Sequence, residues 1–271
     1  MNYHSDEFIM DKMKEHYEDA LKQYPKDRIV GIFYQGSGNY GLDYEGSDVD
    51  TKCVLAPSLK ELAESKMTST TYVRENDEHI DFKDVRTMLD TFKKSNLNFL
   101  EILYTKYYII NPIYEAEWNK LIAARDSIVT MNLPSLLKSM KGIAGEKFHA
   151  LEHRYPSRIE WIDKFGYDPK QLHHLFRIEE FMDRWLFGDS FSDCLISQQP
   201  QWLIDVKKGK YSLGDARRLG KATMDNIQSL YELYISQYPN EINEDVYKLF
   251  DEVVYNTIKT AITLELTKGS D

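Results

Sequence analysis

The sequence predicts an α+β fold, in which an α/β domain over residues 1–112 is followed by a helical domain over residues 113–271. Short runs rich in β-branched and aromatic residues, which are typical of strands, occur only before about Ile110. Beyond Asn111-Pro112 the apolar residues recur every three or four positions, which indicates amphipathic helices. A chain of 271 residues can bury a sizeable core and allows one large or two modest domains.

The first domain is expected to begin with a helix and two strands. Ser5 to Tyr24 predicts a helix, because its apolar residues fall on one stripe and Ser5 can cap its start; Pro25 ends it. Arg28 to Tyr34 is short, apolar and β-branched, which predicts a buried strand that runs into a glycine turn at residues 36–39. Val49 to Leu55 predicts the second strand.

The remainder of this domain is expected to add a hairpin, a helix and a last strand. Thr70 to Arg74 and Glu78 to Phe82 predict a hairpin that turns at residues 75–77. Asp84 can cap a helix that extends through Lys94. The run from Tyr107 to Ile110 favours a strand again.

The second domain is expected to be an all-helical bundle. Four segments carry the helical spacing of apolar residues, namely Leu133 to Tyr155, Pro169 to Phe187, Ser212 to Tyr238 and Glu244 to Lys268. Glycine- and proline-containing breaks separate them, and no internal repeat is visible.

Composition excludes several classes of protein. The formal net charge is −10 and the isoelectric point is about 5.3, so a uniformly basic nucleic-acid binder is excluded and any contact with phosphates requires a local basic patch or a metal ion. The mean hydropathy is −0.53 and no stretch approaches the roughly 20 apolar residues that span a bilayer, so we expect no membrane partner. Cys53 and Cys194 are too few for a disulfide scaffold or a thiolate zinc site, which favours a cytoplasmic location.

The stretch from Tyr34 to Lys52 carries the chemistry. Asp48 and Asp50 are two residues apart at the start of a strand, so both carboxylates point to one face. Two such charges repel unless a cation neutralises them, and hard oxygen ligands of this kind suit Mg²⁺ or Mn²⁺. Gly36-Ser37 supplies a turn whose backbone N–H groups and hydroxyl can approach phosphate oxygens. Together these features predict a metal–nucleotide site.

The pattern Gly36-Ser37, Tyr40-Gly41 and Ser47-Asp48-Val49-Asp50 resembles the signature of the DNA polymerase β nucleotidyltransferase superfamily, particularly a bacterial and phage group of predicted nucleotidyltransferases. Weaker similarity continues through residues 98–103, 167–177 and 209–213. The resemblance implies a mixed-sheet nucleotidyltransferase domain followed by a helical bundle. It also implies a third carboxylate on a neighbouring strand, which Asp81 would provide within His79-Ile80-Asp81-Phe82.

The activity that the resemblance implies is two-metal nucleotidyl transfer. A nucleoside monophosphate moves from a nucleoside triphosphate to an acceptor hydroxyl or phosphate, and pyrophosphate leaves. Asp48 and Asp50 would bridge both metals, Asp81 would hold the metal nearer the acceptor, and Ser37 with the Gly36 amide would hold the β and γ phosphates. Nearby acids at positions 77, 78 and 84 leave the choice of third carboxylate open, because a register slip of one residue turns Asp81 to the other face.

A basic stripe in the helical domain is a second candidate for nucleotide binding. Its members are one helical turn apart on the helix after Pro169, namely Lys170, His173, His174 and Arg177. With Tyr40 of the first motif they would clamp the triphosphate; the alternative is a solvated face balanced by neighbouring acids. The stretch from Lys138 to Arg218 holds 14 basic and 12 acidic residues, so it is mildly basic within an acidic chain.

Several alternatives stay open. The acceptor could be an RNA or tRNA end, a small molecule such as an aminoglycoside, or a protein side chain, because the motif reads only the nucleotide. A nucleotide-sensing or partner-binding module without turnover is the alternative from another class. Lys52 lies on the face of the carboxylate pair, as a salt-bridge partner or a phosphate ligand. His149-Ala150-Leu151-Glu152-His153 matches the inverted zinc-protease motif but would need a further acidic ligand.

Overall fold

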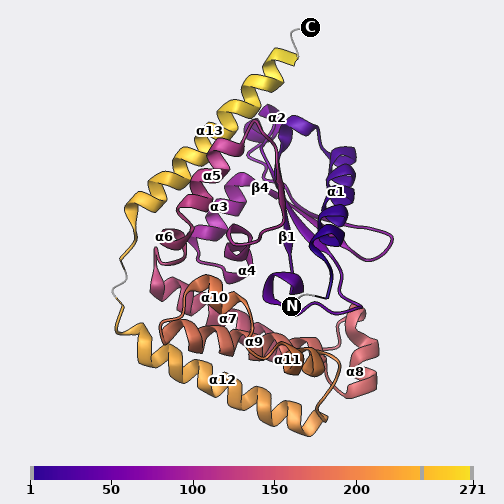
Figure 1. Cartoon of the computed structure of the whole chain (residues 1–271). Coiled ribbons are helices and arrows are strands. Elements are labelled where there is room, and N and C mark those ends of the chain that lie inside the picture. Colours follow the sequence, from indigo (N-terminus) through magenta and orange to yellow (C-terminus); the bar gives the residue numbers. More distant parts are fainter. Residues whose placement is uncertain (1–2, 239–240, 269–271) are drawn as a thin grey trace. The chain divides into compact units, whose positions relative to one another are not determined.

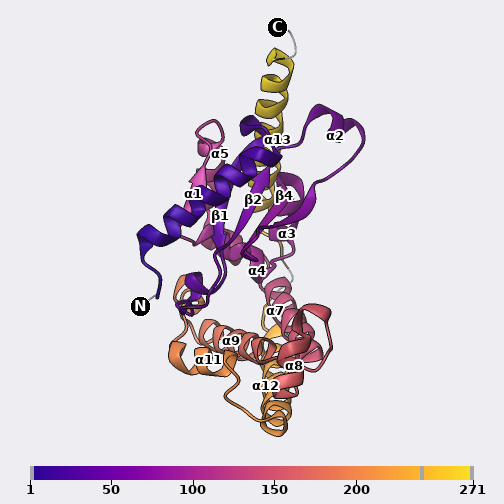
Figure 2. The same cartoon turned by 90° about the vertical axis from the view of Figure 1, so that its right-hand side faces the viewer.

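The computed structural model describes residues 3–238 and 241–268, which form one five-stranded sheet and many helices (Figures 1 and 2). The predicted α+β class is confirmed. The chain divides into two compact units. The sheet unit comprises residues 3–39, 45–131 and 242–268, and the helical unit comprises residues 40–44, 132–238 and 241. No helix in these described ranges combines the length and the apolar character needed to cross a membrane.

The sheet is mixed and has the order β3-β4-β2-β1-β5. Its strands are β1 (Ile29–Gln35), β2 (Asp50–Leu55), β3 (Ser69–Val73), β4 (His79–Asp84) and β5 (Tyr108–Ile110). Only the central β2–β4 pair is parallel, and the other three pairs are antiparallel. Each strand lies within one or two residues of its predicted position, and the hairpin turns at Asp77, which has a positive φ of 63°.

Seven helices of the described residues also belong to the sheet unit. They are α1 (Asp6–Gln23), α2 (Leu59–Ala63), α3 (Val85–Lys93), α4 (Leu97–Leu100), α5 (Glu115–Ala123), α6 (Arg125–Val129) and α13 (Glu244–Lys268), with 3-10 turns η1 (Lys26–Arg28), η2 (Ser37–Tyr40, whose last residue belongs to the helical unit) and η3 (Glu101–Leu103). Ser5 caps α1 and Asp84 caps α3, as the sequence predicts.

Helix α1 covers one face of the sheet, as Figure 2 shows. Ile9, Met13 and Ala20 of this helix are fully buried against inward residues of β1, β2 and β4 such as Ile32 and Cys53. Burying these apolar side chains is the main source of stability for the layer, at about 25 cal/mol per Å² of apolar area removed from water.

The opposite face of the sheet packs on α5 and, beyond it, on α13. The ring of Phe33 stacks on Trp118 at a centroid distance of 4.5 Å, and Phe92 of α3 lies 6.2 Å from Phe250 of α13. Figure 1 shows α13 running alongside α5 and α3. The last helix therefore belongs to the sheet unit, whereas the predicted boundary after residue 112 places it with the helical domain. Its amphipathic pattern could not reveal which core it joins.

The helical unit is built around a central buried helix. Its elements are α7 (Leu133–Ala150), η4 (Pro156–Arg158), α8 (Ile159–Phe165), α9 (Pro169–Leu186), α10 (Phe191–Leu195), α11 (Pro200–Lys207) and α12 (Leu213–Ile235). Helix α9 contacts α7, α10, α11 and α12. Its start is fixed by Asp168, which caps Lys170 N–H and accepts two hydrogen bonds from Arg158 at 2.7 and 2.8 Å. Helix α7 ends five residues before the predicted Tyr155.

Candidate active site

The glycine turn follows β1 directly and is held by its neighbours. Gly36 has a φ of +109°, which a residue with a side chain rarely adopts, and its carbonyl accepts a hydrogen bond from Asn39 N–H at 3.0 Å. The Tyr34 hydroxyl accepts from Gly38 N–H at 3.0 Å. The hydroxyl of Ser37 makes no hydrogen bond to the described part of the chain, and the residue is half-buried. The turn is thus fixed while Ser37 stays accessible.

Asp50 lies beside this turn. In the antiparallel β1–β2 pair the partner of Asp50 is Gln35, the residue that precedes Gly36. The Oδ1 atom of Asp50 accepts a hydrogen bond from His79 N–H at 2.9 Å and lies 3.3 Å from the His79 ring nitrogen Nδ1. Its Oδ2 atom makes no hydrogen bond within the described residues. Asp48, two residues earlier, is exposed in the segment that leads into β2.

Asp81 stands on the same face of the sheet, one strand away. The parallel β2–β4 register pairs it with Lys52, and the β3–β4 register pairs it with Thr71. Thr71 donates its hydroxyl hydrogen to Asp81 Oδ1 at 2.6 Å, and the Gln35 amide donates to Oδ2 at 3.2 Å. Asp81 therefore shares a face of the sheet with Asp50 and Lys52, and the one-residue register slip does not occur; its role as third carboxylate stays a prediction.

Lys52 lies between the carboxylates on this face. Its ammonium group donates to the Gln35 side-chain oxygen and lies 4.7 Å from the centre of the Phe99 ring. Burial lowers the pKa of Lys52 to about 8, although the charges of Asp81 and Asp50 act to raise it. The charges of Asp81 and Asp50 therefore both act on the Lys52 ammonium group. Cys53 points to the opposite, core side as predicted, where burial raises the pKa of its thiol.

These residues fit a divalent cation only in part. Within the described residues, no three His, Cys, Asp or Glu side chains are grouped closely enough to hold a metal ion. Mg²⁺, however, characteristically takes one or two protein carboxylates and completes its shell with water and substrate phosphates. The Oδ2 atom of Asp50 and the exposed carboxylate of Asp48 are oxygen donors of this kind, so a phosphate-bridged ion suits the donor set.

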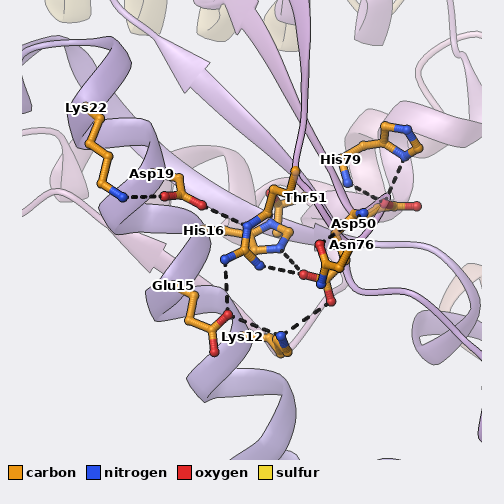
Figure 3. A network of polar contacts seen from close by, with 11 residues as sticks. Lys12, Glu15, His16, Asp19, Lys22, Asp50, Thr51, Asn76 and His79 are labelled. Atoms are coloured by element: carbon orange, nitrogen blue, oxygen red, sulfur yellow. Dashed lines mark hydrogen bonds and ion pairs between the residues drawn. The ribbon is translucent and has the colours of Figure 1, made fainter.

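A polar network behind the sheet touches the same strands (Figure 3). His16 of α1 is fully buried, with Nδ1 2.9 Å from the Thr51 hydroxyl and Nε2 3.1 Å from Glu78 Oε2. Arg74 donates to Glu78 at 2.6 Å and to Asp19 at 2.8 Å. Burial acts to raise the pKa of Glu78, but hydrogen bonds from His16, Asn76 and Arg74 outweigh it and hold this pKa at about 2.

The predicted basic stripe lies within the helical unit, together with Tyr40. Arg177 is buried with its guanidinium carbon 3.8 Å above the centre of the Tyr40 ring, so these two candidates do meet. Lys170 is exposed. Lys207 and Lys208, which the sequence did not single out, each lie 4.7 Å from the centre of the Tyr44 ring.

The two histidines of the stripe do not fit a charged clamp. The Nδ1 atom of His173 lies 2.9 Å from the Leu203 carbonyl oxygen, and burial lowers the pKa of His173 to about 3, helped by nearby Lys207 and Arg177. Burial, followed by His173 and Arg177, also lowers the pKa of His174. Both rings are neutral at neutral pH, so neither supplies positive charge to a triphosphate.

The zinc-protease motif has a structural explanation instead. Glu152 accepts two hydrogen bonds from Arg217 of α12, at 2.9 and 2.6 Å. His149 and His153 are exposed, and their ring centres are 6.3 Å apart. The Glu152 carboxylate therefore joins α12 to the end of α7 rather than facing a metal.

Sequence reasoning missed the residues that hold the carboxylates. Strand pairing brings Gln35, Thr71 and the His79 backbone to the carboxylates, and no local sequence spacing predicts these contacts. His16 is equally hidden, because its partners lie 35 and 62 residues away in the chain.

No protein-family model matches this chain, and no curated protein matches its sequence. Among solved structures it is similar to a nucleotidyltransferase-like protein from Exiguobacterium sibiricum 255-15. The identity is 11% and the TM-score 0.31, over 83% of this chain and 75% of that one. So distant a likeness carries no argument about activity.

Proposed function

We propose that this protein is a metal-dependent nucleotidyltransferase, which moves a nucleoside monophosphate from a nucleoside triphosphate to an acceptor and releases pyrophosphate. The β1–β2 pairing is the observation that supports it most strongly, because it sets the Gly36-Ser37 turn beside Asp50. A turn with an accessible hydroxyl, next to a carboxylate with an uncommitted oxygen, combines a phosphate cradle with a cation ligand.

Each residue has a role in this proposal. Ser37 and the Gly36 amide hold the β and γ phosphates, and Asp48 with Asp50 holds Mg²⁺ or Mn²⁺. The metal, when bound, neutralises charge on the transferring phosphoryl group and on the leaving oxygen. Thr71 and Gln35 each donate a hydrogen bond that keeps Asp81 in place, and in this proposal Asp81 holds the metal nearer the acceptor. Catalysis of this kind depends mainly on positioning and charge neutralisation.

The transfer is a single displacement at phosphorus. An acceptor oxygen forms a bond to the α-phosphorus, the bond from that phosphorus to the bridging oxygen breaks, and its electron pair leaves with pyrophosphate. An acceptor hydroxyl loses its proton to Asp81 Oδ2, whose 3.2 Å hydrogen bond from Gln35 is the longer of the two that Asp81 receives. An acceptor phosphate needs no such proton transfer.

The acceptor is left open by these residues, because they address only the nucleotide and the cation. An RNA or tRNA end, a small hydroxylated molecule such as an aminoglycoside, and a protein side chain all remain compatible. A nucleotide-sensing module would keep the same turn and carboxylates but would bind the triphosphate without releasing pyrophosphate.

The test measures pyrophosphate release from each of the four nucleoside triphosphates with Mg²⁺, in the presence of RNA, protein or metabolite fractions. Asp50→Asn should lower the rate by at least about a hundredfold, since it removes charge where the transition state needs it. Asp77→Asn is the matched control, because Asp77 is an exposed acid in the neighbouring hairpin turn whose positive φ asparagine accepts. Equal activity of Asp50→Asn and the unaltered protein would refute the proposal.

A further inference from the structure

We infer that His16, a buried residue of helix α1, positions Asp50 from the far side of the sheet; this inference rests on the function proposed above. The side chains of β2 alternate between faces, so Thr51 points to α1 while Asp50 and Lys52 point to the opposite face. His16 does not touch the proposed metal–nucleotide face. It acts through β2 and β4, the two strands that form this face.

His16 reaches the beginning of both strands. Through Thr51 it holds the residue directly after Asp50, at 2.9 Å. Through Glu78 it holds the residue directly before His79, at 3.1 Å, and His79 N–H is the donor to Asp50 Oδ1. Figure 3 shows His16 beside Thr51, and Asp50 with its contacts to His79. One ring therefore links the two segments whose relative position orients this carboxylate.

Hydrogen-bonding chemistry fixes the orientation of the ring. Glu78 is ionised at neutral pH and can only accept, so the Nε2 atom of His16 must carry the hydrogen that points to it. The Thr51 hydroxyl can donate or accept and completes the other side. The His16 ring carries two polar atoms on opposite sides, and together they satisfy both partners from this position on α1.

Burying this polar network costs free energy, so added stability alone does not explain it. His16 and Glu78 are almost completely withdrawn from water, and buried polar pairs that include a charge are often no more stabilising than apolar residues of the same size. What they add is specificity. A shift of one residue between β2 and β4 would turn Asp81 to the wrong face, and the two hydrogen bonds of His16 oppose that shift.

The test compares variants of the full chain by direct Mn²⁺ binding in calorimetry, by the Mg²⁺ concentration for half-maximal pyrophosphate release, and by melting temperature. His16→Phe removes both polar contacts and should weaken Mn²⁺ binding about tenfold, the loss typical of residues that orient a metal ligand. His16→Gln, which retains one polar contact, should recover part of it. Met13→Ala is the control, because Met13 is fully buried in the same helix without a polar role.

Thr51→Val removes the contact between His16 and Thr51 without altering α1, and it replaces His16→Phe in the test if that variant does not fold. Thr51→Val should also weaken Mn²⁺ binding. The double variant His16→Phe/Thr51→Val should bind Mn²⁺ little more weakly than His16→Phe alone, because both changes break the same contact. If Mn²⁺ affinity falls equally in Met13→Ala and His16→Phe, positioning by His16 is refuted while the proposed function stands. If the unaltered protein neither binds Mn²⁺ nor releases pyrophosphate, the proposed function itself fails, and the inference with it.

Discussion

Replacing Glu78 by glutamine should cost this protein stability in a way that depends on pH. Glu78 is almost fully buried, and it receives hydrogen bonds from His16 at 3.1 Å and Arg74 at 2.6 Å, with Lys12 at 3.8 Å. These contacts favour the ionised carboxylate over the neutral acid. Glutamine keeps the shape and one acceptor oxygen but removes the charge that Arg74 and Lys12 require.

The magnitude follows from the pKa of this carboxyl. Its value falls from an ordinary 4.5 to about 2 in the folded chain, which corresponds to about 3 kcal/mol of stability at pH 7. The contribution is fully present above the unfolded value of 4.5 and is lost as the pH falls through 2. At pH 3 the same two values leave less than half of this contribution, about 1 kcal/mol.

Urea unfolding followed by circular dichroism, at pH 7 and at pH 3, measures this difference. Glu15→Gln is the matched control, because Glu15 also pairs with Arg74, at 3.1 Å, but half of its side chain is exposed. We expect it to change stability by no more than about 0.5 kcal/mol at either pH. The reasoning is refuted if Glu78→Gln matches this control at pH 7, or if its deficit is as large at pH 3 as at pH 7.

Two further outcomes follow from backbone geometry and burial. Gly209 has a φ of +91°, and a Cβ atom at this position would overlap the Phe165 ring, so Gly209→Ala should lower the free energy of unfolding by at least about 2 kcal/mol. Gly142→Ala, in the open interior of α7, should be neutral or stabilising. Equal effects of the two variants in thermal unfolding would contradict the packing. Burial raises the pKa of Cys194 to about 12 and also raises that of Cys53, so a thiol reagent at pH 8 should modify neither in the native chain and both in denaturant, and native labelling would show the burial to be wrong.

Local sequence signals predicted the strands and the long helices of this fold well, but not short helices such as α5 and α11. Ser5 and Asp84 cap the helices that their positions announce, and the strands begin and end within two residues of expectation. Caps, turns and apolar spacing are properties of neighbouring residues, so they can be read along the chain. The glycine turn and the face shared by Asp50, Lys52 and Asp81 also followed from spacing and resemblance.

Contacts between distant segments could not be predicted in the same way. Helix α13 joins the sheet unit because Phe250 meets Phe92, and nothing in its heptad-like spacing distinguishes that partner from a helix of the other unit. The basic stripe on α9 illustrates the same limit. The spacing correctly indicated a helix. His173 and Arg177 are buried, however, because α11 and residues 40–44 pack against them, and these contacts cannot be read from the spacing.

The charges on the proposed active face explain why so many neutral donors surround it. Lys52 is the buried cation there, and it stands against Asp50 and Asp81, with exposed Asp48 two residues before β2. Even with Lys83 nearby on the same face, the lysines carry fewer charges than these three carboxylates, and Gln35, Thr71 and the His79 amide each donate a hydrogen bond that holds Asp50 or Asp81 in place. Under the proposed function, the remaining negative charge would attract a divalent cation, and a triphosphate arriving with that cation would be neutralised rather than repelled. An acidic chain can therefore bind a polyanionic substrate without a basic surface.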